Sequence, residues 1–379
     1  MVSFLVFFFL IYGGAHAYAL MRTALGLRLG WKGVLPLAAL FLFMVFAPVI
    51  VHYLEKAGYQ APARALSFIG YTWMGIMFLF VSTSLAVDFY RVGLWVLGLL
   101  LRADLSRFEV PARLSVQVPL ILAIIISVYG YFEALNIRVE NLSVATSKLP
   151  PGLEKLRIVQ VSDVHLGLIV RGKRLRLILE HVKNANPDIL VSTGDLVDGE
   201  INRLPGIAEM LREINPRYGK YAVTGNHEYY AGLPRALEFT KKAGFTLLRG
   251  EAVSEGPINI AGVDDLTGRY YGEAGQDSEV KLLSSLPREK FTLFLKHRPM
   301  LEEASTGLFD LQLSGHSHKG QIFPFSLVTS MYYPTDAGRL ELPEGAALYV
   351  SRGSGTWGPP IRFLAPPEVT IIEIIRKRK

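Results

Sequence analysis

The chain has 379 residues, half of them hydrophobic, a formal net charge of +7 and no cysteine. Without cysteine the protein cannot form disulfides, sulfur-ligated zinc sites or a thiol nucleophile. A mean hydropathy of +0.30 is high for a wholly globular protein, so we expect a membrane part joined to a globular part. Much of the excess positive charge lies in the connectors of the apolar part and in the last four residues, which favours contact with anionic lipid over nucleic acid.

Residues 1–132 form the apolar part, in which Leu, Phe, Val and Ile occur in blocks of about 20 residues, the length that crosses a bilayer core as a helix. We expect about four transmembrane helices there, at about residues 2–20, 34–53, 66–87 and 114–132. Their interiors carry almost no ionisable residue, which favours a membrane anchor over a transporter with a regulatory domain. The stretch 92–101 is too short to cross and is expected to be interfacial, although a fifth, shorter span there would invert the topology.

The connectors between these spans differ in Lys and Arg content. The first carries three such residues, the second two and the third four, so the positive-inside rule places the first and third connectors in the cytoplasm. We therefore expect a multi-pass protein of the cell membrane whose C-terminal part lies outside the cytoplasm.

The globular part begins after a linker, expected at residues 133–155, and extends over residues 156–379. It alternates apolar, strand-like runs with helical stretches, the pattern of an α/β domain. Five of the apolar runs lead directly to polar residues: Asp163, Asp195, Asn226, His297 and His316. Because open α/β folds place their sites at the carboxyl ends of central strands, we expect these side chains to converge at one rim.

Five short segments of this domain contain five of the eight histidines of the chain: SDVHLG, GDLVDG, GNHE, KHRP and GHSHKG. Histidine, aspartate and asparagine supply the nitrogen and oxygen ligands that bind Mn, Fe or Zn. Two divalent cations about 4 Å apart can share one carboxylate and activate a water for attack on phosphorus. The five segments together predict a two-metal phosphoesterase.

The order DxH, GD, GNHE, H and GHxH resembles the calcineurin-like metallophosphoesterase superfamily over roughly residues 156–375. The resemblance implies a four-layer αββα sandwich and two divalent metal ions, with Mn as the first expectation and Fe or Zn as alternatives. It implies these metal ligands: Asp163, His165 and His318 for the first ion, Asn226, His297 and His316 for the second, and Asp195 bridging both.

The same resemblance assigns roles to three residues that are not ligands. His227 would lie beside the phosphate and stabilise charge or protonate the leaving oxygen, and Glu228 would orient His227. Asp198 could be a nearby polar partner or a plain loop residue. Asp264 and Asp265 could border the site or cap a turn, and neither is expected to be a ligand.

The C-terminal segments GHSHKGQ and LYVSRGSG are similar to a membrane-associated branch of the superfamily, the YkuE/YaeI-like and transmembrane metallophosphoesterase-domain proteins. The branch implies hydrolysis of a phosphodiester or pyrophosphate bond in a lipid or lipid-linked nucleotide such as UDP-2,3-diacylglucosamine. Lys319, where the branch has glycine, could bind a second phosphate or be a surface substitution. Arg352 and Arg362 could bind phosphate through their planar fork of donors.

The sequence leaves two questions with alternative answers: the location of an apolar segment, and whether the metal-binding domain is catalytic. The apolar residues from Ile322 to Val328 could be core, or a membrane-facing lip that passes an acyl chain toward the metals. A noncatalytic metal-binding scaffold on the same fold is the alternative function. The oligomeric state has no sequence signal.

Overall fold

The computed structural model describes residues 2–199, 206–254, 256–272 and 278–377, with side chains from residue 6 onward. The chain divides into two compact units. One unit contains Met1–Phe132 and Gly358–Ile361, and the other contains Glu133–Trp357 and Arg362–Lys379.

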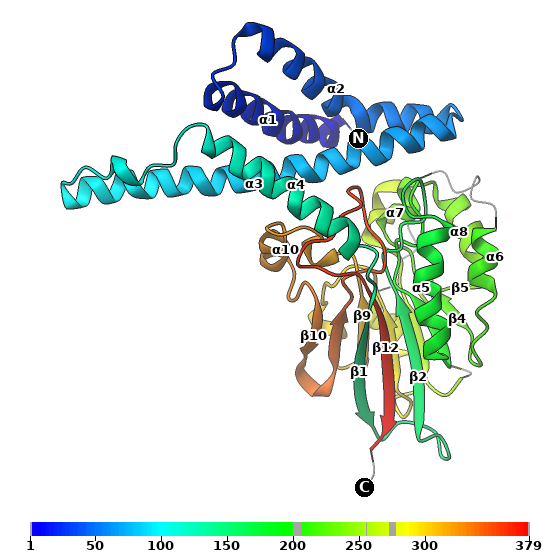
Figure 1. The fold of residues 1–379 in the computed structure, drawn as a ribbon. Coiled ribbons are helices and arrows are strands. Elements are labelled where there is room, and N and C mark those ends of the chain that lie inside the picture. The colour runs from blue at the N-terminus through cyan, green and yellow to red at the C-terminus, as the bar shows by residue number, and fades with distance from the viewer. Residues whose placement is uncertain (1, 200–205, 255, 273–277, 378–379) are drawn as a thin grey trace. The chain divides into compact units, whose positions relative to one another are not determined.

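The first unit is helical (Figure 1). Its elements are α1 (Val2–Gly26), α2 (Trp31–Lys56), α3 (Gln60–Leu101), the 3₁₀ turn η1 (Ser106–Phe108) and α4 (Leu114–Glu133). Within the described residues, α2, α3 and α4 are long and apolar enough to cross a membrane. The first predicted span, 2–20, is helical as part of α1, but its first side chains lie outside the described residues. Apolar side chains cover all faces of these helices, as expected where the surroundings are lipid.

The stretch 92–101 is not a separate interfacial segment, because α3 continues through it as one helix of 42 residues. At 1.5 Å per residue such a helix is about 63 Å long, roughly twice a bilayer core. It does not reverse direction, so the structure gives residues 92–101 no separate helix that could form a fifth span. Asp88 of α3 pairs with Arg22 and accepts a 2.5 Å hydrogen bond from Tyr18 Oη. These bonds join α1 to α3.

The second unit is built on two six-stranded sheets, each with parallel and antiparallel pairs. The first sheet has the order β1 (Arg138–Thr146), β12 (Glu368–Arg376), β2 (Lys155–Val161), β3 (Ile189–Ser192), β4 (Lys220–Ala222) and β5 (Thr246–Leu247). The second has the order β10 (Gly338–Glu341), β11 (Ala347–Val350), β9 (Leu311–Ser314), β8 (Thr292–Leu295), β7 (Asn259–Gly262) and β6 (Glu251–Val253).

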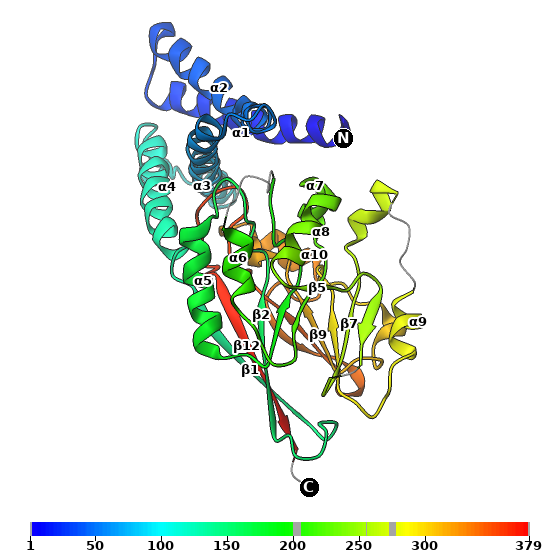
Figure 2. The same cartoon turned by 90° about the vertical axis from the view of Figure 1, so that its right-hand side faces the viewer.

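Helices cover the outer faces of both sheets, so the predicted αββα sandwich is confirmed (Figure 2). Helices of these outer layers include α5 (Gly172–Ala185), α6 (Ile207–Arg212), α8 (Leu233–Lys242) and α9 (Glu279–Ser284). Successive residues of β2 show how the layers form, since Ile158 packs into the core between the sheets and Val159 into the core beneath α5. Leu283 of α9 packs with Phe294 of β8 on the outer face of the second sheet.

The expected linker, residues 133–155, contains a strand. β1 pairs in parallel with β12 over nine residues, from Arg138 opposite Glu368 to Thr146 opposite Arg376. Only Leu142 and Thr146 of its nine residues are buried, because it is an edge strand, and a run with so few buried residues resembles a linker in sequence. The sheet unit therefore begins at Glu133 and not at residue 156.

Candidate metal centre

Central strands of both sheets deliver the candidate ligands to one rim. In the first sheet, β2 leads to Asp163, β3 to Asp195 and β4 to Asn226, and these three strands are parallel. In the second sheet, the parallel strands β8 and β9 lead to His297 and His316. Because each strand ends just before its polar residue, the side chains project from the carboxyl ends of the strands, where α/β folds assemble their sites.

The side chains form three overlapping groups of potential ligands, one of which, His165, Asp195 and His227, includes the histidine that was expected not to be a ligand. Asp163, His165 and His318 make the first group, in which Nε2 of His165 and Nε2 of His318 are 3.1 Å apart. Asp195, His297 and His316 make the second group, in which Nε2 of His297 lies 3.1 Å from Nδ1 of His316.

Two further side chains complete the arrangement. Oδ1 of Asn226 lies 3.3 Å from Nε2 of His297 and so joins the second group. Asp195 lies between the groups, since its Oδ2 atom is 3.3 Å from Nε2 of His297 and 3.8 Å from Nε2 of His165. A carboxylate in this position can be shared by two cations.

The donor set fits a pair of divalent cations. A transition-metal ion lies about 2.1 Å from an imidazole nitrogen, so two ligands at right angles on one ion are about 3 Å apart, close to the 3.1 Å separations of both histidine pairs. Burial lowers the pKa of His165 to about 4 and that of His316 to about 3, toward the neutral form that binds metal, whereas at His297 the charges of Asp195 and Asp163 outweigh burial and raise the pKa to about 10. The nitrogen and oxygen donors suit Mn, Fe or Zn.

Backbone conformation also marks this rim. Five of the seven candidate ligands have left-handed φ angles: Asp163 (51°), His165 (54°), Asp195 (49°), His316 (69°) and His318 (49°). Each such residue costs about 1–3 kcal/mol and persists only where its surroundings impose it. Two glycines allow the close approach, because a Cβ on Gly315 would overlap the Asp163 carboxylate and one on Gly225 would overlap that of Asp195.

Comparison with known proteins agrees with this geometry. The model of the calcineurin-like phosphoesterase family matches residues 156–320. A metallophosphoesterase of Aquifex aeolicus is 42% identical over 67% of this chain and 97% of its own length. The chain belongs to the calcineurin-like metallophosphoesterases. A Campylobacter jejuni metallophosphoesterase is 31% identical over 99% of this chain and 100% of its own length, and a Danio rerio transmembrane protein with a metallophosphoesterase domain is 33% identical over 73% and 67%.

The protein is therefore a metal-dependent phosphoesterase, and its apolar helices make it a membrane protein. Members of this family use divalent metals, and the two groups at the rim could hold them.

Glu228 of the metallophosphoesterase does not orient His227, contrary to the expectation from sequence. Its carboxylate is buried and accepts four backbone N–H bonds: from Asp195 (2.9 Å), Leu196 (2.8 Å), Val197 (3.3 Å) and Gly225 (2.6 Å). Glu228 thus joins the loop that carries Asp195 to the turn that carries Asn226, at the start of α7 (Asn226–Tyr230).

Asp198 is the partner of His227. Its Oδ1 atom lies 3.0 Å from Nδ1 of His227, and the His227 backbone N–H donates to Oδ1 of Asp195 at 2.8 Å. Burial lowers the pKa of His227, but the charges of Asp195 and Asp198 outweigh it and raise that pKa to about 9. His227 therefore carries a proton at neutral pH, the state required of a general acid.

The two arginines that were expected to bind phosphate have structural partners instead. Arg352 pairs with Glu140 and with Glu368, the latter at 2.8 Å, and its Nε donates to the Pro366 carbonyl. Arg362 is fully buried. Its guanidinium donates to five backbone carbonyls: those of His318, Arg352, Gly353, Gly355 and Ala365.

Arg362 thereby fixes the loop of a candidate ligand, because it donates to the His318 carbonyl at 3.1 Å and lies 3.0 Å from Nδ1 of the same residue. The arginine supports a candidate ligand and does not face substrate. Lys319, next to His318, is partly buried, and its backbone N–H donates to Ser317 Oγ at 3.2 Å.

The remaining acidic candidates, Asp264 and Asp265, have the structural contacts of turn residues: Asp265 caps a 3₁₀ helix, and both form ion pairs with arginines. Asp265 accepts from Thr267 N at the start of η3 (Leu266–Tyr271) and binds Arg298 through Nε at 2.8 Å. Asp264 pairs with Arg249 at 2.8 Å. Aromatic rings contact the histidines of the rim, with Tyr230 and Trp357 against His227 and Tyr333 against His316.

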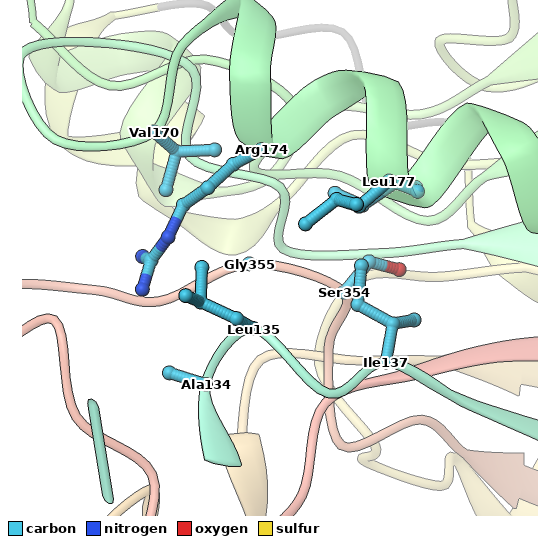
Figure 3. Close-up of a pocket in the computed structure, with 9 residues that line it drawn as sticks. Ala134, Leu135, Ile137, Val170, Arg174, Leu177, Ser354 and Gly355 are labelled. Carbon is cyan, nitrogen blue, oxygen red and sulfur yellow. The ribbon is translucent and has the colours of Figure 1, made fainter. Parts of the chain in front are cut away.

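A small cavity lies elsewhere in the sheet unit (Figure 3). It has a volume of about 10 Å³ and is lined mainly by apolar side chains such as Leu135, Val170 and Leu177. A space of this size holds at most one water. None of the candidate ligands lines it, so it is a packing gap and not a substrate pocket.

Proposed function

We propose that this metallophosphoesterase hydrolyses a phosphodiester or pyrophosphate bond in a lipid or lipid-linked nucleotide, of which UDP-2,3-diacylglucosamine is one example. The observation that carries the proposal is the position of Asp195 between two groups of imidazole and carboxylate donors. A shared carboxylate with imidazoles on both sides is the donor arrangement of a two-metal hydrolytic site.

The residues have the following roles in the proposed mechanism. Asp163, His165 and His318 would hold the first cation, Asn226, His297 and His316 would hold the second, and Asp195 would contribute to both. When bound, the two divalent cations would acidify a water and neutralise the phosphate oxygens. Mn is the proposed metal, with Fe and Zn as alternatives that the same ligands accept.

His227 moves the proton. Asp198 binds its Nδ1, which leaves Nε2 for the substrate. The ring is protonated at neutral pH and donates to the departing oxygen, so that the leaving group does not depart as an alkoxide. Glu228 and Arg362 hold the ligand loops in place.

The lipid character of the substrate is supported by the membrane helices in the same chain. Lys319 directly follows His318 and could bind a second phosphate of a pyrophosphate substrate. Three basic residues, Arg102, Arg107 and Arg113, lie between α3 and α4, so we place this connector in the cytoplasm and the catalytic unit, after α4, on the outer side.

Hydrolysis of bis(p-nitrophenyl) phosphate by the purified full-length protein with added Mn tests the reaction. We expect turnover by the wild type and its loss, with folding retained, in Asp195→Asn and His227→Ala. His181→Ala serves as the matched control, since His181 lies in α5 outside the cluster. A wild type that is inert with Mn, Fe, Zn and Ni alike would overturn the proposal in favour of a noncatalytic scaffold.

A further inference from the structure

Helix α10 (Ser326–Tyr332) has its apolar face outward. Leu327, Val328, Met331 and Tyr332 are 57%, 55%, 89% and 67% exposed, and their spacing places them on one side of the helix. Thr329 is buried on the other side, where its Oγ1 donates to Oδ2 of Asp336 at 3.0 Å. A surface helix of a soluble domain normally shows the reverse pattern.

The apolar surface extends to the loop before α10. Phe323 is 39% exposed and Phe325 is 46% exposed, whereas Ile322 is buried. Residues 320–334 contain no charged side chain. We call the six exposed residues the apolar lip: Phe323, Phe325, Leu327, Val328, Met331 and Tyr332. Monomeric soluble domains rarely leave such a continuous apolar surface without a partner.

The apolar lip is joined to the candidate metal centre. His318 begins η5 (His318–Gly320), and α10 starts six residues after this turn ends. Ser317 Oγ donates to the Asp336 carbonyl at 2.5 Å, and the ring of Tyr333 contacts His316 edge-on at 5.9 Å. Asp336 therefore binds both the loop of His316 and His318 and the buried side of α10, so the lip is held at a constant position beside the ligands.

We propose that the apolar lip inserts into the lipid bilayer, where it contacts the acyl chains of the substrate while the phosphate reaches the metal centre. Insertion is favoured because the apolar helices of the same chain keep the catalytic unit at a membrane, and because an uncharged, apolar helix face with tyrosine at its end matches the chemistry of the bilayer interface. Delivery of a lipid rests on the proposed function, whereas insertion does not.

Site-specific fluorescence tests insertion in the full-length protein reconstituted into phosphatidylcholine–phosphatidylglycerol vesicles. Since the chain has no cysteine, Met331→Cys introduces a single labelling site for an environment-sensitive dye, and Lys242→Cys, exposed on α8, is the matched control. We expect the dye at position 331, and not at 242, to shift to shorter wavelength, to be quenched by lipids with nitroxide on the acyl chain and to be protected from aqueous iodide.

Each other outcome overturns insertion. Equal iodide quenching at the two positions would mean that the lip stays in water. Iodide protection at position 331 without quenching by nitroxide lipids would mean that a second copy of the chain, and not the bilayer, covers the lip.

Kinetics test the role of the lip in substrate delivery. In the variant Leu327→Ser/Met331→Ser we expect the ratio of turnover on a vesicle-borne phospholipid to turnover on bis(p-nitrophenyl) phosphate to fall at least about tenfold. An unchanged ratio would overturn delivery. Failure of the proposed function is distinguishable, because a wild type that hydrolyses neither substrate leaves the fluorescence result intact.

Discussion

Asp198 Oδ1 and His227 Nδ1 are 3.0 Å apart, although 29 positions separate the two residues in the chain. The carboxylate that orients the candidate general acid thus comes from the loop after β3 and not from Glu228, the residue next to His227. This hydrogen bond orients the imidazole, and the charge of Asp198 adds to that of Asp195 in raising its pKa, so we expect Asp198 to affect proton transfer to the leaving oxygen.

Replacing Asp198 with Asn should lower kcat by roughly 10- to 100-fold, since a positioned general acid contributes about 10²–10⁴-fold. Activity requires protonated His227 and so falls as the pH rises through its pKa of about 9. The substitution removes one charge that raises this pKa, so the alkaline limb of the rate profile should move to lower pH. The measurement is kcat against pH, with metal content as the control; an unmoved alkaline limb would contradict the role of Asp198.

Glu228→Gln should weaken metal binding more than it changes the chemistry of the bound enzyme. A Gln side chain has one acceptor oxygen, whereas the Glu228 carboxylate accepts four backbone N–H bonds from the loops of Asp195 and Asn226. We expect metal affinity to fall by about 10- to 100-fold, as for other groups that support metal ligands. Metal analysis after dialysis measures this, and full metal retention would argue against the loop-joining role.

Removal of divalent metal should abolish hydrolysis and destabilise the catalytic unit. Several carboxylates and imidazoles meet at the rim, and cations that bind only the folded state stabilise it by about 2.7 kcal/mol at 100 times Kd. Treatment with a chelator should therefore lower the melting temperature of the full-length protein, and Mn should restore both stability and activity. If the wild type kept its activity after verified metal removal, the two-metal site would be wrong.

Arg362→Met should destabilise the fold and disturb His318. The buried guanidinium satisfies five backbone carbonyls, and leaving such groups without donors costs about 1–3 kcal/mol each, less whatever water can replace. The expected result is a lower melting temperature together with weaker metal binding. Arg339→Met is the comparison, because Arg339 pairs with the exposed Glu341 and its loss should change stability by under about 1 kcal/mol.

Much of the catalytic unit was predictable from sequence because its signals are local. Apolar runs indicated β2, β3, β8 and β9, and each run led to a residue type that binds metal. The edge strand β1 was missed, since only Leu142 and Thr146 of its nine residues are buried and its sequence therefore resembles a linker. The continuity of α3 through Asp88 was also missed, because the partners of that carboxylate, Arg22 and Tyr18, lie on α1.

The sequence by itself determined the class of chemistry, because the capacity to bind metal belongs to residue types and their order along the chain was distinctive. Tertiary structure alone decided the roles of Asp198, Glu228 and Arg362, since these depend on which donors and acceptors the fold brings near each side chain. It also decided the left-handed backbone at five candidate ligands and the outward face of α10. The physical reason is that contacts between segments distant in the sequence impose the backbone strain and decide which face of a helix stays uncovered. A local sequence pattern therefore predicts neither the strain nor the uncovered face.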